Sequence, residues 1–131
     1  MLRSGILNPA LLSLLARVRH TNTLVIADRG FLSWPGLETV DLSLVDGIPT
    51  VSQVVAAIRP NFSIARAFLA KEFRRHNSAA AAGELLAQLR GVAVEFEPHL
   101  AMKRRVPLAI GLIRTGDTRP FSNLILQSGD G

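Results

Sequence analysis

Short apolar runs typical of buried strands alternate with capped, amphipathic segments typical of helices along the whole of this chain. Asn8 followed by Pro9 is a helix N-cap with proline at the first helical position, and Thr50 and Ser78 are further caps. The segment 62–70 fits either a strand or a helix, and we favour a strand. The patterns predict helices over 9–19, 51–59, 79–90 and 98–105, and strands over 23–27, 38–44, 62–70, 92–97, 108–116 and 122–128.

Strands that alternate with helices predict an α/β fold, because two parallel strands need a crossover between them, usually a helix. We expect a single three-layer α/β/α domain over residues 1–131 with a largely parallel, mixed sheet. The mixed character is expected because only a short turn separates the last two strands, which favours some antiparallel pairing. A chain of this length can bury roughly two thirds of the surface of its unfolded form.

The apolar content is high for a chain of this size, since hydrophobic residues make up 48% of it and the mean hydropathy is +0.28. The longest apolar runs reach about half of the ~20 residues that a membrane span needs. The chain has no cysteine, which excludes disulfides and a thiolate nucleophile. We therefore expect a cytoplasmic protein that has no membrane partner and hides its surplus apolar surface in a homo-oligomer.

The charge is strongly basic, with a net charge of +5 and a pI of about 11.3. The basic residues are scattered, however, with no run longer than 103–105, and the chain has no Tyr and one Trp. Surfaces that bind nucleic acid combine clustered basic residues with aromatic side chains that stack on bases. The pattern therefore argues against a nucleic-acid partner and fits solubility and attraction for anions.

Two polar groups flank the apolar run 23–27, because His20 precedes it and Asp28 follows it. An imidazole and a carboxylate suit proton transfer near neutral pH. The alternative is that His20 only finishes a helix and that Asp28 only opens a turn. A second histidine, His76, lies in the segment Arg-Arg-His-Asn-Ser, where we expect a solvated loop.

The third histidine, His99, directly follows an expected strand, where ligand clefts of α/β sheets usually lie. Lys103 comes four residues later and therefore shares a helical face with His99. Residues 114–117 leave another strand, and Asn123 begins the last one. The chain has no Gly-rich phosphate loop, serine nucleophile elbow or metal-ligand spacing, so we expect neither a metal nor a cofactor. The remaining imidazole, carboxylate and amide groups suit proton transfer on a neutral polyhydroxylated ligand.

Four stretches of the chain resemble the D-ribose pyranase family of sugar mutarotases, which is closely related to L-fucose mutarotase. They are GILNPALLSLLARVRHTNTLVIADRG, VDLSLVDGIPTVSQV, HLAMK and LIRTGDTRPFSNLILQSG, in this order. The most specific parts are His-Thr-x-Thr followed by Asp, and Ile-Arg-Thr-Gly-Asp followed by Asn. The first stretch favours the ribose branch, so the resemblance implies an isomerase that interconverts pyranose and furanose forms of free D-ribose.

The resemblance implies a role for each matched residue. The proton donor of the family falls on His20, and the carboxylate that contacts the sugar falls on Asp28. A later histidine of the family falls on His99, and we expect Lys103 to bind substrate on the same helical face. The Tyr-Ala-Asn triplet of the family, which also binds substrate, falls on Phe121, Ser122 and Asn123.

The family assembles into cytoplasmic rings with sites between subunits, which implies a ring-shaped homo-oligomer here, a decamer being one candidate size. The chain departs from the family at three positions: Asn22 replaces an Asp, Arg29 replaces an Ala, and Phe121 replaces the Tyr. The change at Phe121 is the most serious, because it removes a hydroxyl that could bind sugar or exchange a proton.

The spacing of His20 and Asp28 adds a geometric constraint. A five-residue strand spans roughly 16 Å, whereas one sugar is under ~8 Å across. Either the loop 19–22 curls back along the strand, or the site combines groups from two subunits.

Two other functions fit the same residues. One is a mutarotase for L-fucose or another sugar, and the other is a catalytically weakened sugar-binding or regulatory protein that lacks the Tyr hydroxyl.

Overall fold

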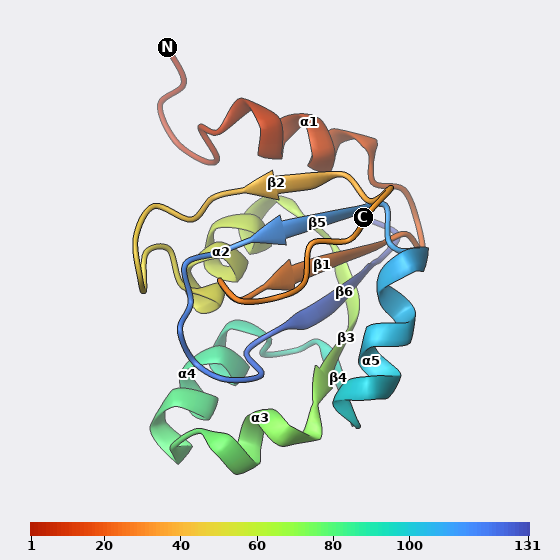
Figure 1. The fold of residues 1–131 in the computed structure, drawn as a ribbon. Coiled ribbons are helices and arrows are strands. Elements are labelled where there is room, and N and C mark those ends of the chain that lie inside the picture. Colours follow the sequence, from red (N-terminus) through yellow and green to blue (C-terminus); the bar gives the residue numbers. More distant parts are fainter.

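A computed structural model describes residues 1–131, with a six-stranded mixed sheet at its centre (Figure 1). Strand β6 (Leu124–Ser128) alone runs antiparallel to its neighbours β1 (Thr23–Ala27) and β3 (Ile64–Ala70), and all other pairs are parallel. The predicted α/β class with a largely parallel, mixed sheet is thereby confirmed. The last two strands do not pair with each other, however, because β1 lies between them. In spatial order the strands are β2 (Thr39–Asp41), β5 (Gly111–Arg114), β1 (Thr23–Ala27), β6 (Leu124–Ser128), β3 (Ile64–Ala70) and β4 (Ala93–Glu97).

The expected capping residues begin three of the five α-helices. The side chain of Asn8 accepts a hydrogen bond from the Leu11 N–H, and the side chain of Ser78 accepts one from the Ala81 N–H. Thr50 forms a capping box with Gln53. The helices are α1 (Pro9–Arg17), α2 (Val51–Ile58), α3 (Lys71–His76), α4 (Ala79–Gln88) and α5 (His99–Arg105), with 3₁₀ turns at Arg59–Asn61 and Val106–Leu108.

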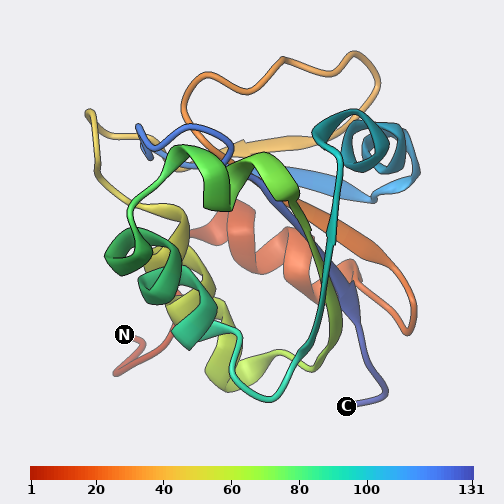
Figure 2. The same cartoon turned by 90° about the horizontal axis from the view of Figure 1, so that it is seen from below.

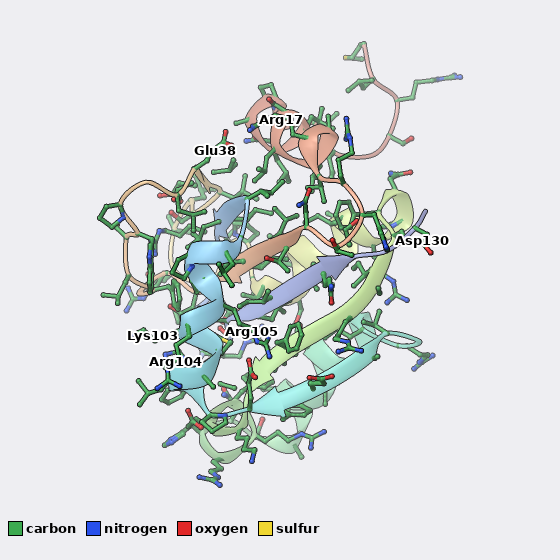
Figure 3. The ribbon with its side chains drawn as sticks, turned by 90° about the vertical axis from the view of Figure 1, so that its right-hand side faces the viewer. Arg17, Glu38, Lys103, Arg104, Arg105 and Asp130 are labelled. Carbon is green, nitrogen blue, oxygen red and sulfur yellow. The ribbon has the colours of Figure 1, made fainter.

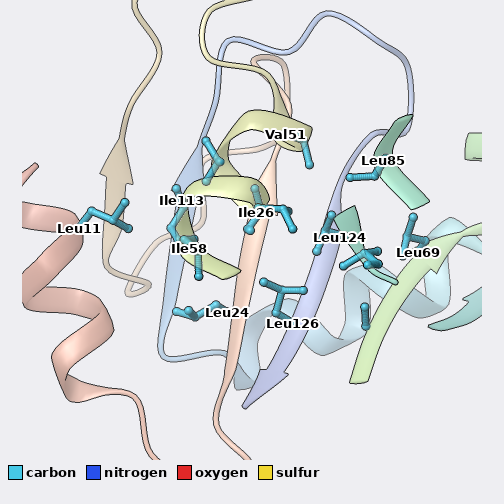
Figure 4. Close-up of a cluster of buried hydrophobic side chains, with 14 of the residues drawn as sticks. Leu11, Leu24, Ile26, Val51, Ile58, Leu69, Leu85, Ile113, Leu124 and Leu126 are labelled. Carbon is cyan, nitrogen blue, oxygen red and sulfur yellow. The ribbon is translucent and has the colours of Figure 1, made fainter. Parts of the chain in front are cut away.

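Two apolar cores lie on opposite faces of the sheet. The larger core packs α1, α2 and α4 against alternate residues of the central strands, with Leu24, Ile26 and Leu124 at its middle (Figure 4). The smaller core packs Met102 of α5 against Val25 and other residues of the opposite strand faces. Figure 2 shows α5 on the other side of the sheet from α2 and α4, so the fold has three layers. None of its helices has the length and apolarity needed to cross a membrane.

Several element boundaries differ from the sequence-based prediction. Residues 71–76 form α3, so His76 ends a helix and does not lie in a loop. This helix has six residues and no side-chain cap, which leaves little local signal for it. Helix α1 ends at Arg17, three residues before His20, so His20 does not finish that helix. The strand expected over 38–44 is only Thr39–Asp41, and the one expected over 108–116 begins after a 3₁₀ turn.

The strand directions determine which side chains can meet. The carboxyl ends of β1, β5, β3 and β4 share one edge of the sheet, and β6 begins at that edge because it runs the other way. Asp28, His99 and Asn123 therefore gather there. His20, which precedes β1, lies at the opposite edge together with the end of β6.

Candidate functional site

A polar cavity of about 240 Å³ opens at the carboxyl edge of the parallel strands. This volume leaves room for one small polar ligand. Five predicted site residues line it, and the full lining is Asp28, Gly30, Phe31, Leu32, His99, Lys103, Pro120, Phe121 and Asn123. No group of three or more His, Cys, Asp or Glu side chains is arranged to hold a metal ion.

The Asp28 carboxylate is held by local hydrogen bonds. The Gly30 N–H donates to Asp28 Oδ1 at 2.9 Å, and the Asp28 N–H donates to Asn123 Oδ1 at 2.7 Å. The antiparallel register that pairs Ile26 with Leu124 brings the two residues together. Burial raises the pKa of the Asp28 carboxyl, against the hydrogen bonds that favour its ionised form. A raised pKa makes this carboxylate a better proton acceptor than an ordinary aspartate.

Arg114 fixes the loop that carries Asp28. Its guanidinium donates to the Phe31 carbonyl at 2.6 Å and to the Arg29 carbonyl at 3.3 Å, with a longer contact to Leu32 at 3.4 Å. These contacts hold the backbone of residues 28–32 as one wall of the cavity. The sequence did not predict this role of Arg114, because the carbonyls that it binds lie more than 80 residues away in the chain.

His99 and Lys103 lie about one turn apart on α5 and face the cavity together, as their spacing predicts. The backbone N–H of His99 donates to Glu72 Oε2 at 2.8 Å, which fixes the start of the helix. Burial, together with the nearby Lys103 ammonium, lowers the pKa of the His99 imidazole, so it is neutral at pH 7. Its Nδ1 atom is buried without a partner, which leaves Nε2 to contact a ligand.

Phe121 forms the wall between two histidines. Its ring centroid lies 5.1 Å from that of His99 and 5.1 Å from that of His76. Phe121 has a φ of 56°, a left-handed conformation that is unfavourable for a bulky residue. Asn77 Nδ2 donates to the Pro120 carbonyl at 2.8 Å and thereby holds this turn. The sequence did not predict the contact between Phe121 and His76, because it gave no sign of helix α3, which brings His76 close to this turn.

Ser122 lies apart from the cavity that its neighbours line. It is 1% exposed, and its Oγ has no hydrogen-bond partner. Its side chain is therefore not in place to contact a ligand in this cavity.

His20 also lies apart from the cavity, at the other edge of the sheet. The Thr21 N–H donates to the Ser128 carbonyl, and the Ser128 N–H donates to the Asn22 carbonyl. These bonds hold the 19–22 loop at the amino end of β1, so the loop does not curl back along the strand. His20 borders a second hollow, of about 330 Å³, whose lining includes Ser63 and Asp130. Figure 3 shows Asp130 and Lys103 toward opposite ends of the sheet.

The comparisons with known proteins agree over almost the whole chain. Residues 1–130 match the model of the RbsD / FucU transport protein family. The chain is 42% identical to a D-ribose pyranase of Chromobacterium violaceum over 98% of both chains. It is 40% identical to a D-ribose pyranase of Geobacillus kaustophilus, over 98% of this chain and 94% of the relative.

Two solved structures give the fold comparison. Bacillus subtilis RbsD in complex with D-ribose matches with a TM-score of 0.91 and 32% identity, over 98% of both chains. The fucose mutarotase of Streptococcus pneumoniae in complex with L-fucose matches with a TM-score of 0.75 and 17% identity, over 95% of this chain and 94% of that one. The second likeness shows a shared fold only.

Proposed function

Because the chain belongs to the RbsD / FucU transport protein family, we infer that it is a mutarotase that interconverts the pyranose and furanose forms of free D-ribose. The observation that carries this function is the 42% sequence identity to a D-ribose pyranase over 98% of both chains, together with the likeness to a ribose-bound structure. The fucose alternative fits less well, since the fucose-bound neighbour shares only 17% identity.

Ring opening needs two proton movements. One group must protonate the ring oxygen while another accepts the proton of the anomeric hydroxyl, which gives the open-chain aldehyde. Ring closure reverses these roles with a different hydroxyl of the sugar. Imidazole suits both directions near neutral pH. We propose His20 as the principal acid and base, with His99 as the second donor or acceptor.

The other cavity residues bind and orient the sugar. Asp28 and Asn123 are fixed against each other and offer an anionic acceptor and an amide to neighbouring hydroxyls. Lys103 adds an ammonium donor next to the neutral His99.

The distance between His20 and the cavity supports a site shared by two subunits. The two lie at opposite ends of β1, whose five residues span roughly 16 Å, so one sugar cannot reach both in one chain. We propose that His20 of one subunit closes the cavity of another within a ring-shaped, cytoplasmic homo-oligomer. Large apolar side chains exposed on the single chain support such an interface, among them Leu7, Leu44 and Leu108.

Saturation-transfer NMR on free sugars tests the function, because it measures exchange between ring forms directly. We expect the protein to accelerate exchange between the pyranose and furanose signals of D-ribose more than exchange of L-fucose. A protein that accelerates neither would not be a mutarotase for these sugars.

A weakened sugar-binding protein is the second candidate, because Phe121 lacks the hydroxyl of the family's Tyr. The cavity keeps Asp28, His99 and Asn123, which favours an active enzyme over a binder.

Restoring the hydroxyl decides between the two. A neutral hydrogen bond contributes roughly 0.5–1.5 kcal/mol, so we expect Phe121→Tyr to raise ribose exchange by no more than about 10-fold above an active wild type. An inactive wild type that gains activity only in this variant would show that the natural chain is a binder.

A further inference from the structure

His20 forms an ion pair with a carboxylate from the other end of the sequence. Its Nδ1 lies 2.7 Å from Asp130 Oδ1. Both side chains are exposed in the single chain, at 64% for His20 and 86% for Asp130. An exposed pair of this kind adds little to stability, so its significance lies in what it does to the imidazole.

The backbone places Asp130 at this position. Strand β6 runs antiparallel to β1, so its end returns to the turn that carries His20. The Gly129 N–H donates to the Ser63 carbonyl at 3.0 Å. A Cβ on Gly129 would lie only 2.6 Å from Ser63 Oγ, so a larger residue at this position would need the Ser63 side chain to move.

The hydrogen-bond partner of one imidazole nitrogen determines whether the other nitrogen carries a proton or a free lone pair. A carboxylate accepts only from the Nδ1–H tautomer, in which Nε2 carries the free lone pair. The same carboxylate stabilises the imidazolium that forms when Nε2 takes a proton, as in a Ser-His-Asp triad.

We propose that Asp130 is a positioning residue, which holds His20 in the Nδ1–H tautomer so that Nε2 exchanges protons with the sugar. This inference rests on the proposed function, in which His20 is the principal acid and base.

Two readouts on the intact oligomer test the pair in Asp130→Asn and Asp130→Glu. Long-range ¹H–¹⁵N spectra of ¹⁵N-histidine protein at pH 9 report the tautomer of each neutral imidazole, and ribose exchange reports catalysis. Glu38→Gln is the matched control, because it removes a carboxylate from the exposed ion pair with Arg17, whose N···O distance is also 2.7 Å.

We expect the wild-type His20 signal to be that of the Nδ1–H tautomer, and Asp130→Asn to shift it toward the Nε2–H form. Losing a hydrogen bond to a charged group should lower kcat by about 10-fold and leave KM nearly unchanged. Asp130→Glu should restore most of the activity, and Glu38→Gln should match the wild type. In a His20→Ala background, Asp130→Asn should cause no further loss.

The inference would be overturned if the wild type is active and Asp130→Asn has the same His20 tautomer and the same kcat as the wild type. So would an equal loss in Asp130→Asn with and without His20. A wild type that exchanges no sugar would instead defeat the proposed function, and the tautomer spectra would still show whether Asp130 controls the ring.

Discussion

Replacing His20 with alanine lowers the rate of ribose ring-form exchange by about 10²–10⁴-fold, the usual contribution of one positioned proton-transfer group. The fold should persist, because His20 is exposed and its side chain pairs only with Asp130. Exposed substitutions of this kind change the free energy of unfolding by about 0.5 kcal/mol or less. Saturation-transfer NMR measures the rate, and urea unfolding measures the stability.

His76 provides a matched histidine control. It is exposed and does not line the cavity, although its ring contacts Phe121, which does. His76→Ala should therefore change exchange by less than about threefold. Full exchange activity in a folded His20→Ala protein would remove His20 from the mechanism.

Asp117→Ala should destabilise the fold by about 1–3 kcal/mol, the usual cost of leaving a buried hydrogen-bond donor without its acceptor. The Asp117 side chain is 1% exposed and pairs with Arg119 at 3.0 Å. Its Oδ2 also accepts from the Val51 N–H at 2.9 Å, where α2 begins. The substitution leaves the Val51 N–H without a partner and the Arg119 guanidinium with Glu84 as its remaining partner, and urea unfolding measures the loss.

Asp46→Ala is the control for this substitution. Asp46 also pairs with an arginine, Arg29, but its side chain is 68% exposed. Its removal should cost no more than about 1 kcal/mol. Equal losses in the two variants would show that burial at Asp117 has no special role.

The stability should also depend on pH through Asp117. Burial opposes its ionisation, but the hydrogen bonds from Arg119 outweigh that effect and hold the pKa of Asp117 below its ordinary value. The resulting stabilisation is present above the unfolded-state pKa near ~3.9, and it is lost as the pH falls through the lower folded value. Asp117→Asn should therefore flatten the acid limb of a stability-against-pH curve. If the acid limb is the same in Asp117→Asn as in the wild type, other carboxyl groups cause the loss of stability at low pH.

The helices that begin with side-chain caps could be predicted, because the signal is local. Asn8, Thr50 and Ser78 each bond to a backbone N–H three residues away. Helix α3 has no such bond, and it was missed together with the position of His76. The boundaries of β2 and β5 depend on their mutual pairing, which no local pattern specifies.

The site was predictable in its residue types and less so in its geometry. The face shared by His99 and Lys103 follows from helical spacing, and the separation of His20 from Asp28 follows from the length of β1. The insertion of β6 between β1 and β3 depends on the whole sheet. That placement brings Asn123 to Asp28 at one edge, and the antiparallel return of β6 carries Asp130 to His20 at the other.

The central claim is that each site takes its cavity from one subunit and His20 from another, and mixed oligomers test it directly. His20→Ala and Asp28→Asn proteins, each nearly inactive alone, are unfolded together, refolded at equal ratio and assayed by saturation-transfer NMR on D-ribose. Random assembly places an intact cavity next to an intact His20 in about one quarter of the sites, so we predict about one quarter of the wild-type exchange rate. Mixed oligomers that stay as inactive as their parents would contradict a shared site.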